Sequence, residues 1–292
     1  HGSIFRIPAS TTLTASLNSE NIDDSGGDPS TLDLQGNFVR STGTGVVRIT
    51  AVPFNPAGTT TINTGSVRLV KGSTFANTVS IALGATLELN NGTHNLNGEV
   101  RGNGTLDIVG GTFTNNGAFA PGLSPGILTV TRANGVPVHD LNIEIQSESG
   151  AGVGHDQLQI PNAVTMDGNL HIALLNGFVP TVGNSYTILT YASFSGAFSS
   201  VSPSCWTVHY GPTSTYVTYN PPAEICDGLD NDCDGQIDEG VEHPDYAALM
   251  ALYNATDGAN WTDNTGWGAT PCDVCGWYGV GCDVNGRVVS IE

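Results

Sequence analysis

Positive charge is scarce in this chain. Among 292 residues there are 8 Lys and Arg against 27 Asp and Glu, a formal net charge of −19, and Lys71 is the single lysine. Such a surface repels the phosphates of nucleic acids and of anionic lipids, and it attracts divalent cations. We therefore exclude nucleic acid as a partner.

Long apolar runs are missing as well. No stretch of 18 or more apolar residues occurs, so the sequence predicts no membrane span in this chain. A secretory signal segment is not evident, and the first residue is His1 instead of Met. We expect a processed product, a fragment or the remnant of a tag.

Apolar residues recur at helical spacing in one segment, PDYAALMALYNATDGANW, where Asp245 is the expected N-cap. Elsewhere, short runs of β-forming residues alternate with Gly, Asn and Pro turns. Leu87, Leu106 and Leu128 occupy equivalent places in ATLEL, GTLDI and GILTV, 19 and 22 residues apart. A repeat of about 20 residues without helical period is typical of a solenoid. The sequence predicts a mainly β fold, a parallel β-helix (β-solenoid).

This pattern divides the chain into four segments. They are irregular N-terminal β rungs (1–64), the β-helix with its closing end (65–220), an acidic linker (221–242) and a small α+β module (243–292). Alternation places one set of side chains on a common inner face: Val67, Leu69, Ile81, Leu83, Leu87 and Leu89. Four aromatic residues are expected to cap the core at the closing end: Trp206, Tyr210, Tyr216 and Tyr219. We interpret Asp23, Asp24 and Asp28 as parts of a solvated loop.

The runs GNGTL, TNNGAFAPGLSPGILTV, LNIEIQ, GHDQLQI and NLHIALLNGF carry a family resemblance. They resemble the C-terminal part of autotransporter-type passenger domains and, more broadly, the β-strand repeats of large bacterial surface proteins. The resemblance covers about residues 65–219, and the PGLSPGILT box is its most specific part. It implies a secreted, right-handed β-helical shaft and brings no catalytic residues with it.

The last segment is similar to the N-terminal cap of leucine-rich repeat proteins. The similarity runs through ALMALYNATDGANWTDNTGW, the box from Cys275 to Cys282, and NGRVVSIE, over about residues 243–292. In such proteins an array of leucine-rich repeats follows the cap. The similarity therefore implies a module that could display a surface for a protein or glycan ligand.

The strongest chemical signal lies in EICDGLDNDCDGQIDEG. Asp230, Asp232 and Asp234 followed by Gly235 match the start of an EF-hand loop, in which alternate oxygen donors converge on one hard cation. Position 12 of that loop is Val241, so another carboxylate must close the site. The run resembles short CDGxDNDCDGxxDEG calcium motifs of secreted bacterial proteins. We predict a Ca²⁺ site with these ligands: Asp230, Asp232, Asp234, Gln236 through its carbonyl, Asp238 and Glu239.

The six cysteines indicate disulfides and an extracellular location, and the resemblance to bacterial surface proteins implies a bacterial cell surface. A zinc site at Cys272, Cys275 and Cys282 is the alternative, with Cys233 or His243 as fourth donor. The similarity to repeat caps favours disulfides. On that basis Cys226–Cys233 and Cys275–Cys282 are the expected pairs, which leaves Cys205 and Cys272 to bond with each other.

A polysaccharide-degrading enzyme is the least favoured interpretation. Some parallel β-helices cleave polysaccharides, and hydrolysis uses paired acids. The ionisable side chains that cluster in the second half of the predicted β-helix are Asp140, Glu144, Glu148, His155 and Asp156, with Arg132 as the nearest cation. No nucleophile–base set has supporting context among them, so we expect no enzyme activity.

Two functions remain after these exclusions. The first is a secreted structural or adhesive surface protein that assembles head to tail into a filament, through uncovered strands at Ile4–Ile7 and Arg287–Ile291. The second is a binding module, in which a leucine-rich repeat array recognises a protein or glycan and the shaft displays it.

Overall fold

The computed structural model describes residues 4–16, 18, 20–22, 31–50, 52–132 and 135–292. The chain forms two compact units, unit 1 (1–219) and unit 2 (220–292), each of which is treated by itself. Unit 1 is built mainly from strands, unit 2 combines helices with one short hairpin, and the division into four segments stays a prediction. The expected loop at Asp23, Asp24 and Asp28 lies outside the described residues. Within the described part of the chain, no helix is long and apolar enough to cross a membrane.

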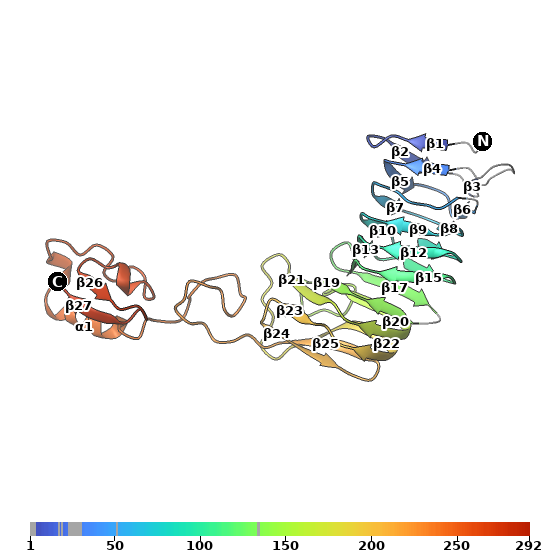
Figure 1. Ribbon diagram of the computed structural model, residues 1–292. Coiled ribbons are helices and arrows are strands. Elements are labelled where there is room, and N and C mark those ends of the chain that lie inside the picture. The colour runs from blue at the N-terminus through green and yellow to red at the C-terminus, as the bar shows by residue number, and fades with distance from the viewer. Residues whose placement is uncertain (1–3, 17, 19, 23–30, 51, 133–134) are drawn as a thin grey trace. The chain divides into compact units, whose positions relative to one another are not determined.

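Unit 1 contains two large sheets and two small ones (Figure 1). The 9-stranded sheet consists of β2 (Thr12–Ala15), β5 (Asn37–Arg40), β7 (Thr60–Ile62), β10 (Val79–Ile81), β13 (Glu99–Gly102), β16 (Ala118–Pro121), β19 (Asp140–Ile145), β21 (Asn169–Leu174) and β23 (Ser200–Ser202). The 11-stranded sheet consists of β3 (Glu20–Ile22), β6 (Val46–Ile49), β8 (Ser66–Leu69), β11 (Thr86–Leu89), β14 (Thr105–Ile108), β17 (Ile127–Arg132), β18 (Val136–Val138), β20 (Gln157–Met166), β22 (Ser185–Gly196), β24 (Trp206–Tyr210) and β25 (Ser214–Tyr219). The small sheets are β9 (Ser73–Phe75) with β12 (Thr93–Leu96) and β15 (Thr112–Asn115), and β1 (Ile4–Ile7) with β4 (Thr31–Leu34).

From β7 to β16 the chain visits three sheets in strict rotation, so every third strand joins the same sheet. All of these pairings are parallel. Leu87 of β11 lies opposite Leu106 of β14, as the repeat predicts. Leu106 in turn faces Val130, and Leu128 faces Leu158, so the predicted equivalence of Leu128 is wrong by two residues. Leu128 and Val130 are two residues apart on β17, so both side chains lie on the inner face and both are buried.

The core of unit 1 consists of the alternating side chains of its strands. Val67, Leu69, Ile81, Leu87 and Leu89 are at most 1% exposed, which confirms the predicted inner face for them. The expectation for Leu83 is wrong, because its side chain is 82% exposed. β10 ends at Ile81, and Leu83 forms a turn with Gly84, whose φ is +77°, so the alternation of the strand no longer applies at Leu83.

The last part of unit 1 changes from parallel to antiparallel pairing. β25 pairs antiparallel with both β22 and β24. Two of the predicted core aromatic residues, Trp206 and Tyr219, are buried, with ring centroids 5.2 Å apart. Tyr210 and Tyr216 are half-buried and stack on Phe194 and His209 respectively, so they cover the surface of this end instead of its core.

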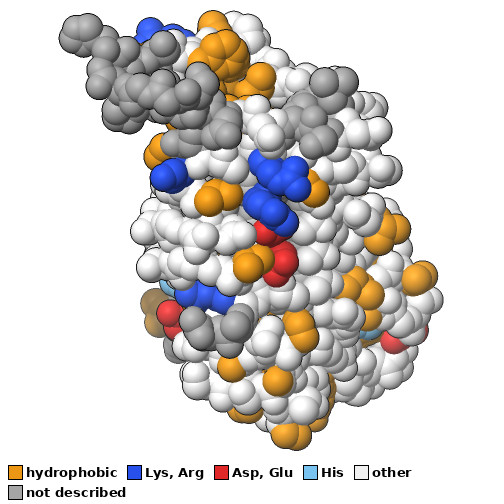
Figure 2. Space-filling model, turned by 90° about the vertical axis from the view of Figure 1, so that its right-hand side faces the viewer, with side chains coloured by type: hydrophobic (Ala, Val, Ile, Leu, Met, Phe, Trp, Pro, Cys, Tyr) orange, Lys and Arg blue, Asp and Glu red, His pale blue; other side chains and the backbone are white. Residues whose placement is uncertain are grey.

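Charged side chains are sparse on the face of the molecule shown in Figure 2, where Lys and Arg gather next to a few Asp and Glu. Arg48 lies opposite Arg68, Arg68 opposite Glu88, and Glu88 opposite Asp107 along the 11-stranded sheet. Arg68 forms an ion pair with Glu88, with 2.7 Å between Nε and Oε1. Neutral polar groups therefore supply most of the polar surface on this face.

Asp156 is a buried carboxyl group that joins two parts of unit 1. It is 1% exposed and accepts hydrogen bonds from the backbone N–H groups of Gly126 (2.7 Å) and Glu144 (2.9 Å). Burial raises the pKa of Asp156 to about 7, although both N–H groups act in the opposite direction. The folded protein therefore holds the Asp156 proton more tightly than the unfolded chain does.

This difference gives a pH dependence with a defined sign. A raised folded pKa favours folding below the unfolded pKa, and the contribution is lost as the pH rises through about 7. We expect Asp156→Asn, which mimics the protonated acid, to reduce the fall in unfolding free energy between pH 5 and pH 8. The reduction between these two pH values is up to about 3 kcal/mol, because the window covers about two pH units below the folded pKa. Urea unfolding at both pH values measures it, and an equal fall in the variant and the wild type would contradict it.

Unit 2 contains α1 (Tyr246–Ala255), the short helices η1 (Gly258–Asn260) and η2 (Val274–Gly276), and the hairpin of β26 (Val280–Cys282) and β27 (Val288–Ile291). Its core is a cluster of Leu249, Trp267, Val274 and Trp277. The predicted helix is confirmed, and Asp245 occupies its N-cap position without a capping hydrogen bond. The Asp245 carboxylate instead accepts hydrogen bonds from Arg287 Nε and the Val288 N–H, both at 2.9 Å, which joins the helix start to β27.

Candidate metal centre

The acidic run of unit 2 folds into a loop held by its own carboxylates. The carboxylate of Asp230 accepts from the backbone N–H groups of Asp234 (3.1 Å) and Gly235 (3.0 Å). Gly235 has a φ of +91°, a conformation that glycine adopts without strain and that permits the sharp turn. This local geometry is the one expected for the first half of an EF-hand-type loop.

Glu224, the first residue of the acidic run, closes the loop although it is not among the predicted ligands. Its Oε1 accepts from the N–H of Asp232 at 2.7 Å, and its Oε2 accepts from the N–H of Asp238 at 3.0 Å. Glu224 is 9% exposed, which makes it one of the few buried acidic residues in the described part of the chain. The backbone at Asp232 and the backbone at Asp238 therefore both donate hydrogen bonds to the same carboxylate.

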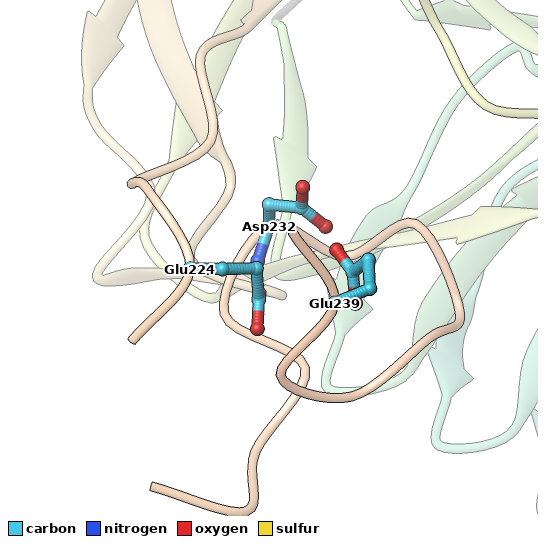
Figure 3. Close-up of side chains that lie close together, drawn as sticks. All are labelled: Glu224, Asp232 and Glu239. Atoms are coloured by element: carbon cyan, nitrogen blue, oxygen red, sulfur yellow. The ribbon is translucent and has the colours of Figure 1, made fainter. Parts of the chain in front are cut away.

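Carboxylates gather in two groups that share Asp232. One group is Glu224, Asp232 and Glu239, whose side chains lie close together in Figure 3, and the other is Asp230, Asp232 and Asp234. Within each group the ligand atoms all lie within 4.8 Å of one another. Oxygen atoms about 2.4 Å from a common Ca²⁺ can be at most about 4.8 Å apart, so both groups have the dimensions of a cation site.

Repulsion between neighbouring carboxylates contributes to raised pKa values in the two clusters. Burial raises the pKa of Asp232, its hydrogen bond from the Asp234 N–H opposes this, and the negative charges of Asp234, Glu224 and Asp230 raise it further. For Glu239, a backbone hydrogen bond that lowers the pKa is outweighed by desolvation and by its acidic neighbours, so the pKa is raised. A bound cation would remove this repulsion.

Glu239 gives separate support for a ligand. Its Oε2 atom is buried and has no hydrogen-bond partner among the described residues. A buried carboxylate oxygen without a donor is costly, and coordination of a cation is one way to satisfy it. The donors gathered here are all oxygen atoms, the ligand type that hard divalent cations prefer.

The predicted ligands divide into two sets. Asp230, Asp232, Asp234 and Glu239 lie in the two clusters, whereas Asp238 lies outside both, and the backbone carbonyl of Gln236 stays a predicted ligand. The carboxylate of Asp238 accepts from the N–H groups of Asp227 (3.0 Å) and Gly228 (3.1 Å), so it stabilises the start of the motif. Gln236 donates to Asp234 through its own N–H (2.8 Å). Sequence analysis missed Glu224, and the only available signal was its position six residues before Asp230.

The disulfides of unit 2 confirm one predicted pair and contradict the others. Cys275 bonds to Cys282 as expected. Cys226 bonds to Cys272, so neither Cys226–Cys233 nor Cys205–Cys272 forms. Cys205 and Cys233 are also oxidised, and the chain has no free cysteine, which removes the zinc alternative. The short loop from 226 to 233 is closed by carboxylate–amide hydrogen bonds instead, and the disulfide connects the motif to the segment before η2.

Several of the ionisable residues of unit 1 that sequence analysis considered for catalysis bind backbone groups. Asp140 accepts from the Asn169 N–H (2.8 Å), and Glu148 accepts from the Thr181 N–H (3.2 Å) as well as from the Tyr186 hydroxyl (2.9 Å). Both ring nitrogens of His155 lie next to backbone carbonyls, those of Ser149 (3.3 Å) and Thr187 (3.2 Å). Burial lowers the pKa of His155.

Both carboxylate clusters have the dimensions of a cation site, and a known family model matches the same segment. The Cu-binding MopE model, described as "Putative metal-binding motif", matches residues 218–239. The match covers both carboxylate clusters, including Glu224. No curated protein matches the chain.

Proposed function

We propose that this protein is an extracellular structural or adhesive protein whose unit 2 is braced by bound Ca²⁺. The observation that carries the proposal is the pair of carboxylate clusters that share Asp232, in a segment similar to a metal-binding motif. Because the segment from 221 to 242 contributes no apolar residue to the core cluster of unit 2, its order depends on the ion and on the Cys226–Cys272 disulfide.

Calcium is favoured over copper by the chemistry of the donors. The residues matched by the family model contain no His, and Cys226 and Cys233 are oxidised, so soft and imidazole donors are missing from the loop. Copper prefers imidazole, thiolate and thioether ligands, whereas Ca²⁺ binds carboxylates and carbonyls. Copper in the family model's name belongs to that family, and the residues of this chain favour a harder ion.

For unit 1 we propose a right-handed parallel β-helix that serves as a shaft. The rotation of the chain through three sheets between β7 and β16, with parallel pairing and a step of about one repeat, supports it. Its likeness to autotransporter-type passenger domains and the oxidised cysteines support an extracellular, cell-surface location. A shaft of this kind needs no catalytic site.

Two related proposals concern partners. The exposed apolar side chains of Val289 (66%) and Ile291 (47%) on β27 favour a module that resembles a leucine-rich repeat cap and supports a binding surface for a protein or glycan. Ile4 (65%) and Phe5 (60%) on β1 are equally exposed and favour head-to-tail self-association. Electron microscopy distinguishes filaments from single particles.

Thermal unfolding tests the calcium proposal. At a Ca²⁺ concentration about 100 times Kd, binding to the folded state stabilises it by about 2.7 kcal/mol. For a unit of this size, each kcal/mol of stabilisation raises Tm by about 4 to 8 °C. We expect calorimetry to show one transition, that of unit 2, moving down when a chelator replaces Ca²⁺, while the transition of unit 1 stays in place. Identical profiles in both conditions would refute the proposal.

A further inference from the structure

A hollow with a mixed polar and apolar lining lies on the outer face of the 9-stranded sheet of unit 1. Its volume is about 320 Å³, and five successive strands of that sheet contribute to it. Its polar lining includes Asp156 and, from the strands, Glu99 and Arg101 of β13, Asn142 and Glu144 of β19, His171 of β21 and Ser202 of β23. The wall at one side is formed by Pro121 and Gly122, the start of the PGLSPG box.

Side-chain length explains why the surface is hollow here. Arg101 lies opposite Ala120 of β16, and Asn142 lies opposite His171 of β21. The outward positions of β16 are Ala118 and Ala120, whose single methyl groups stand between strands that carry long polar side chains. A strand of alanines between strands of long residues leaves a groove across the sheet.

Some polar side chains around the groove bind one another, and one of their donor atoms has no acceptor among the described residues. Asn142 Nδ2 donates to Glu99 Oε2 at 3.3 Å, and Arg101 Nη1 lies 3.8 Å from Glu99 Oε1, so the three side chains share one arrangement. Arg101 Nε is buried and has no hydrogen-bond partner among the described residues. A buried donor without an acceptor at the edge of a hollow favours a ligand that supplies an oxygen atom.

Glu144 is fixed in place by the PGLSPG loop. Ser124 Oγ donates to Glu144 Oε2 at 2.9 Å, and the carboxylate of Asp156 holds the N–H groups of both Glu144 and Gly126. Gly122 must be glycine, because a Cβ atom there would lie 2.4 Å from Asp156 Oδ1. The box that stands out in the sequence therefore builds one wall of the groove.

We infer that this groove binds a neutral oligosaccharide, lying across the strands of the sheet. Glu99 and Glu144 repel anions, the lining mixes polar groups with apolar side chains, and closely spaced donors and acceptors match a chain of hydroxyl groups. Neighbouring strands are about 4.8 Å apart, so these groups recur at a short, regular interval along the groove. The site belongs to unit 1 alone and does not depend on the calcium proposal.

Isothermal titration calorimetry with a fixed panel tests the inference on the whole protein. The probes are cellohexaose, xylohexaose, maltohexaose, laminarihexaose and N-acetylchitohexaose, with an oligogalacturonate and spermine as charged comparisons. We expect at least one neutral hexasaccharide to bind with Kd below about 1 mM, equally with and without chelator. Binding of a charged comparison alone, or of no probe, would overturn the inference.

A matched pair of variants locates the binding. Ala120→Tyr fills the hollow and should weaken binding at least tenfold. Thr61→Tyr places the same ring on the same sheet, at an outward position of β7 outside the groove, and should leave Kd unchanged. Tyrosine is favourable at exposed positions of a strand, so we expect both variants to fold, and their Tm values check this. Equal loss in the two variants, or none in Ala120→Tyr, would overturn the assignment to this groove.

Discussion

Replacing Asp232 with Asn is expected to weaken Ca²⁺ binding by about 100-fold or more, since ligand charge count sets the affinity of such loops over several orders of magnitude. Asp232 is the one residue that belongs to both carboxylate clusters. Its loss removes a charged ligand from each cluster while the amide keeps the size of the side chain. Calorimetric titration of Ca²⁺ into the whole protein measures the change.

Asp227→Asn is the matched control for this change. Asp227 lies in the same motif but outside both clusters, where its Oδ1 accepts from the Leu229 N–H at 2.9 Å, an interaction that Asn preserves. Both variants lower the negative charge by one, so a purely long-range effect would weaken binding equally. We expect less than about a threefold change for Asp227→Asn. Equal losses would place the ion elsewhere.

Removal of the Cys226–Cys272 disulfide is expected to have the second large effect. The bond joins residues 46 apart, whereas Cys275–Cys282 joins residues 7 apart. In the chain-entropy account the longer loop contributes about 4 kcal/mol and the shorter about 2 kcal/mol. We therefore expect the double variant Cys226→Ser/Cys272→Ser to lower the stability of unit 2 more than Cys275→Ser/Cys282→Ser does.

The same variant couples stability to the ion. Without the disulfide, the start of the motif is held to the rest of unit 2 by fewer constraints, and Ca²⁺ must order the segment as it binds. The apparent affinity for Ca²⁺ should fall with Cys226→Ser/Cys272→Ser and stay near wild type with Cys275→Ser/Cys282→Ser. Denaturant unfolding and titration provide both readouts. Equal stability losses in the two double variants would contradict the account.

Local patterns in the sequence predicted much of the secondary structure. Alternation at Val67, Leu69, Leu87 and Leu89 predicted buried side chains because a strand has a fixed period of two. It failed at Leu83, where the strand had already ended and the period no longer applied. Spacing predicted that Leu106 follows Leu87, but not the extra residues of the 121–126 loop, which moved the partner to Val130.

In the candidate metal centre, sequence spacing predicted only the carboxylates that are close together along the chain. Asp230, Asp232 and Asp234 are two residues apart, so the spacing alone brings their carboxylates together. Glu224 joins Asp232 and Glu239 through a closed loop, and such a contact across the motif has no signature in spacing. The partner of Cys226 was missed for the same reason, because Cys272 is near it in space and distant along the chain.

The most direct test of the central claim is a titration of the whole protein with Ca²⁺ and, separately, with Cu²⁺, after treatment with a chelator. A loop of carboxylate oxygens with oxidised cysteines predicts saturable Ca²⁺ binding that Asp232→Asn weakens by about 100-fold or more, and weaker Cu²⁺ binding that this variant changes little. Tight Cu²⁺ binding lost in Asp232→Asn, together with no measurable Ca²⁺ binding, would contradict the account.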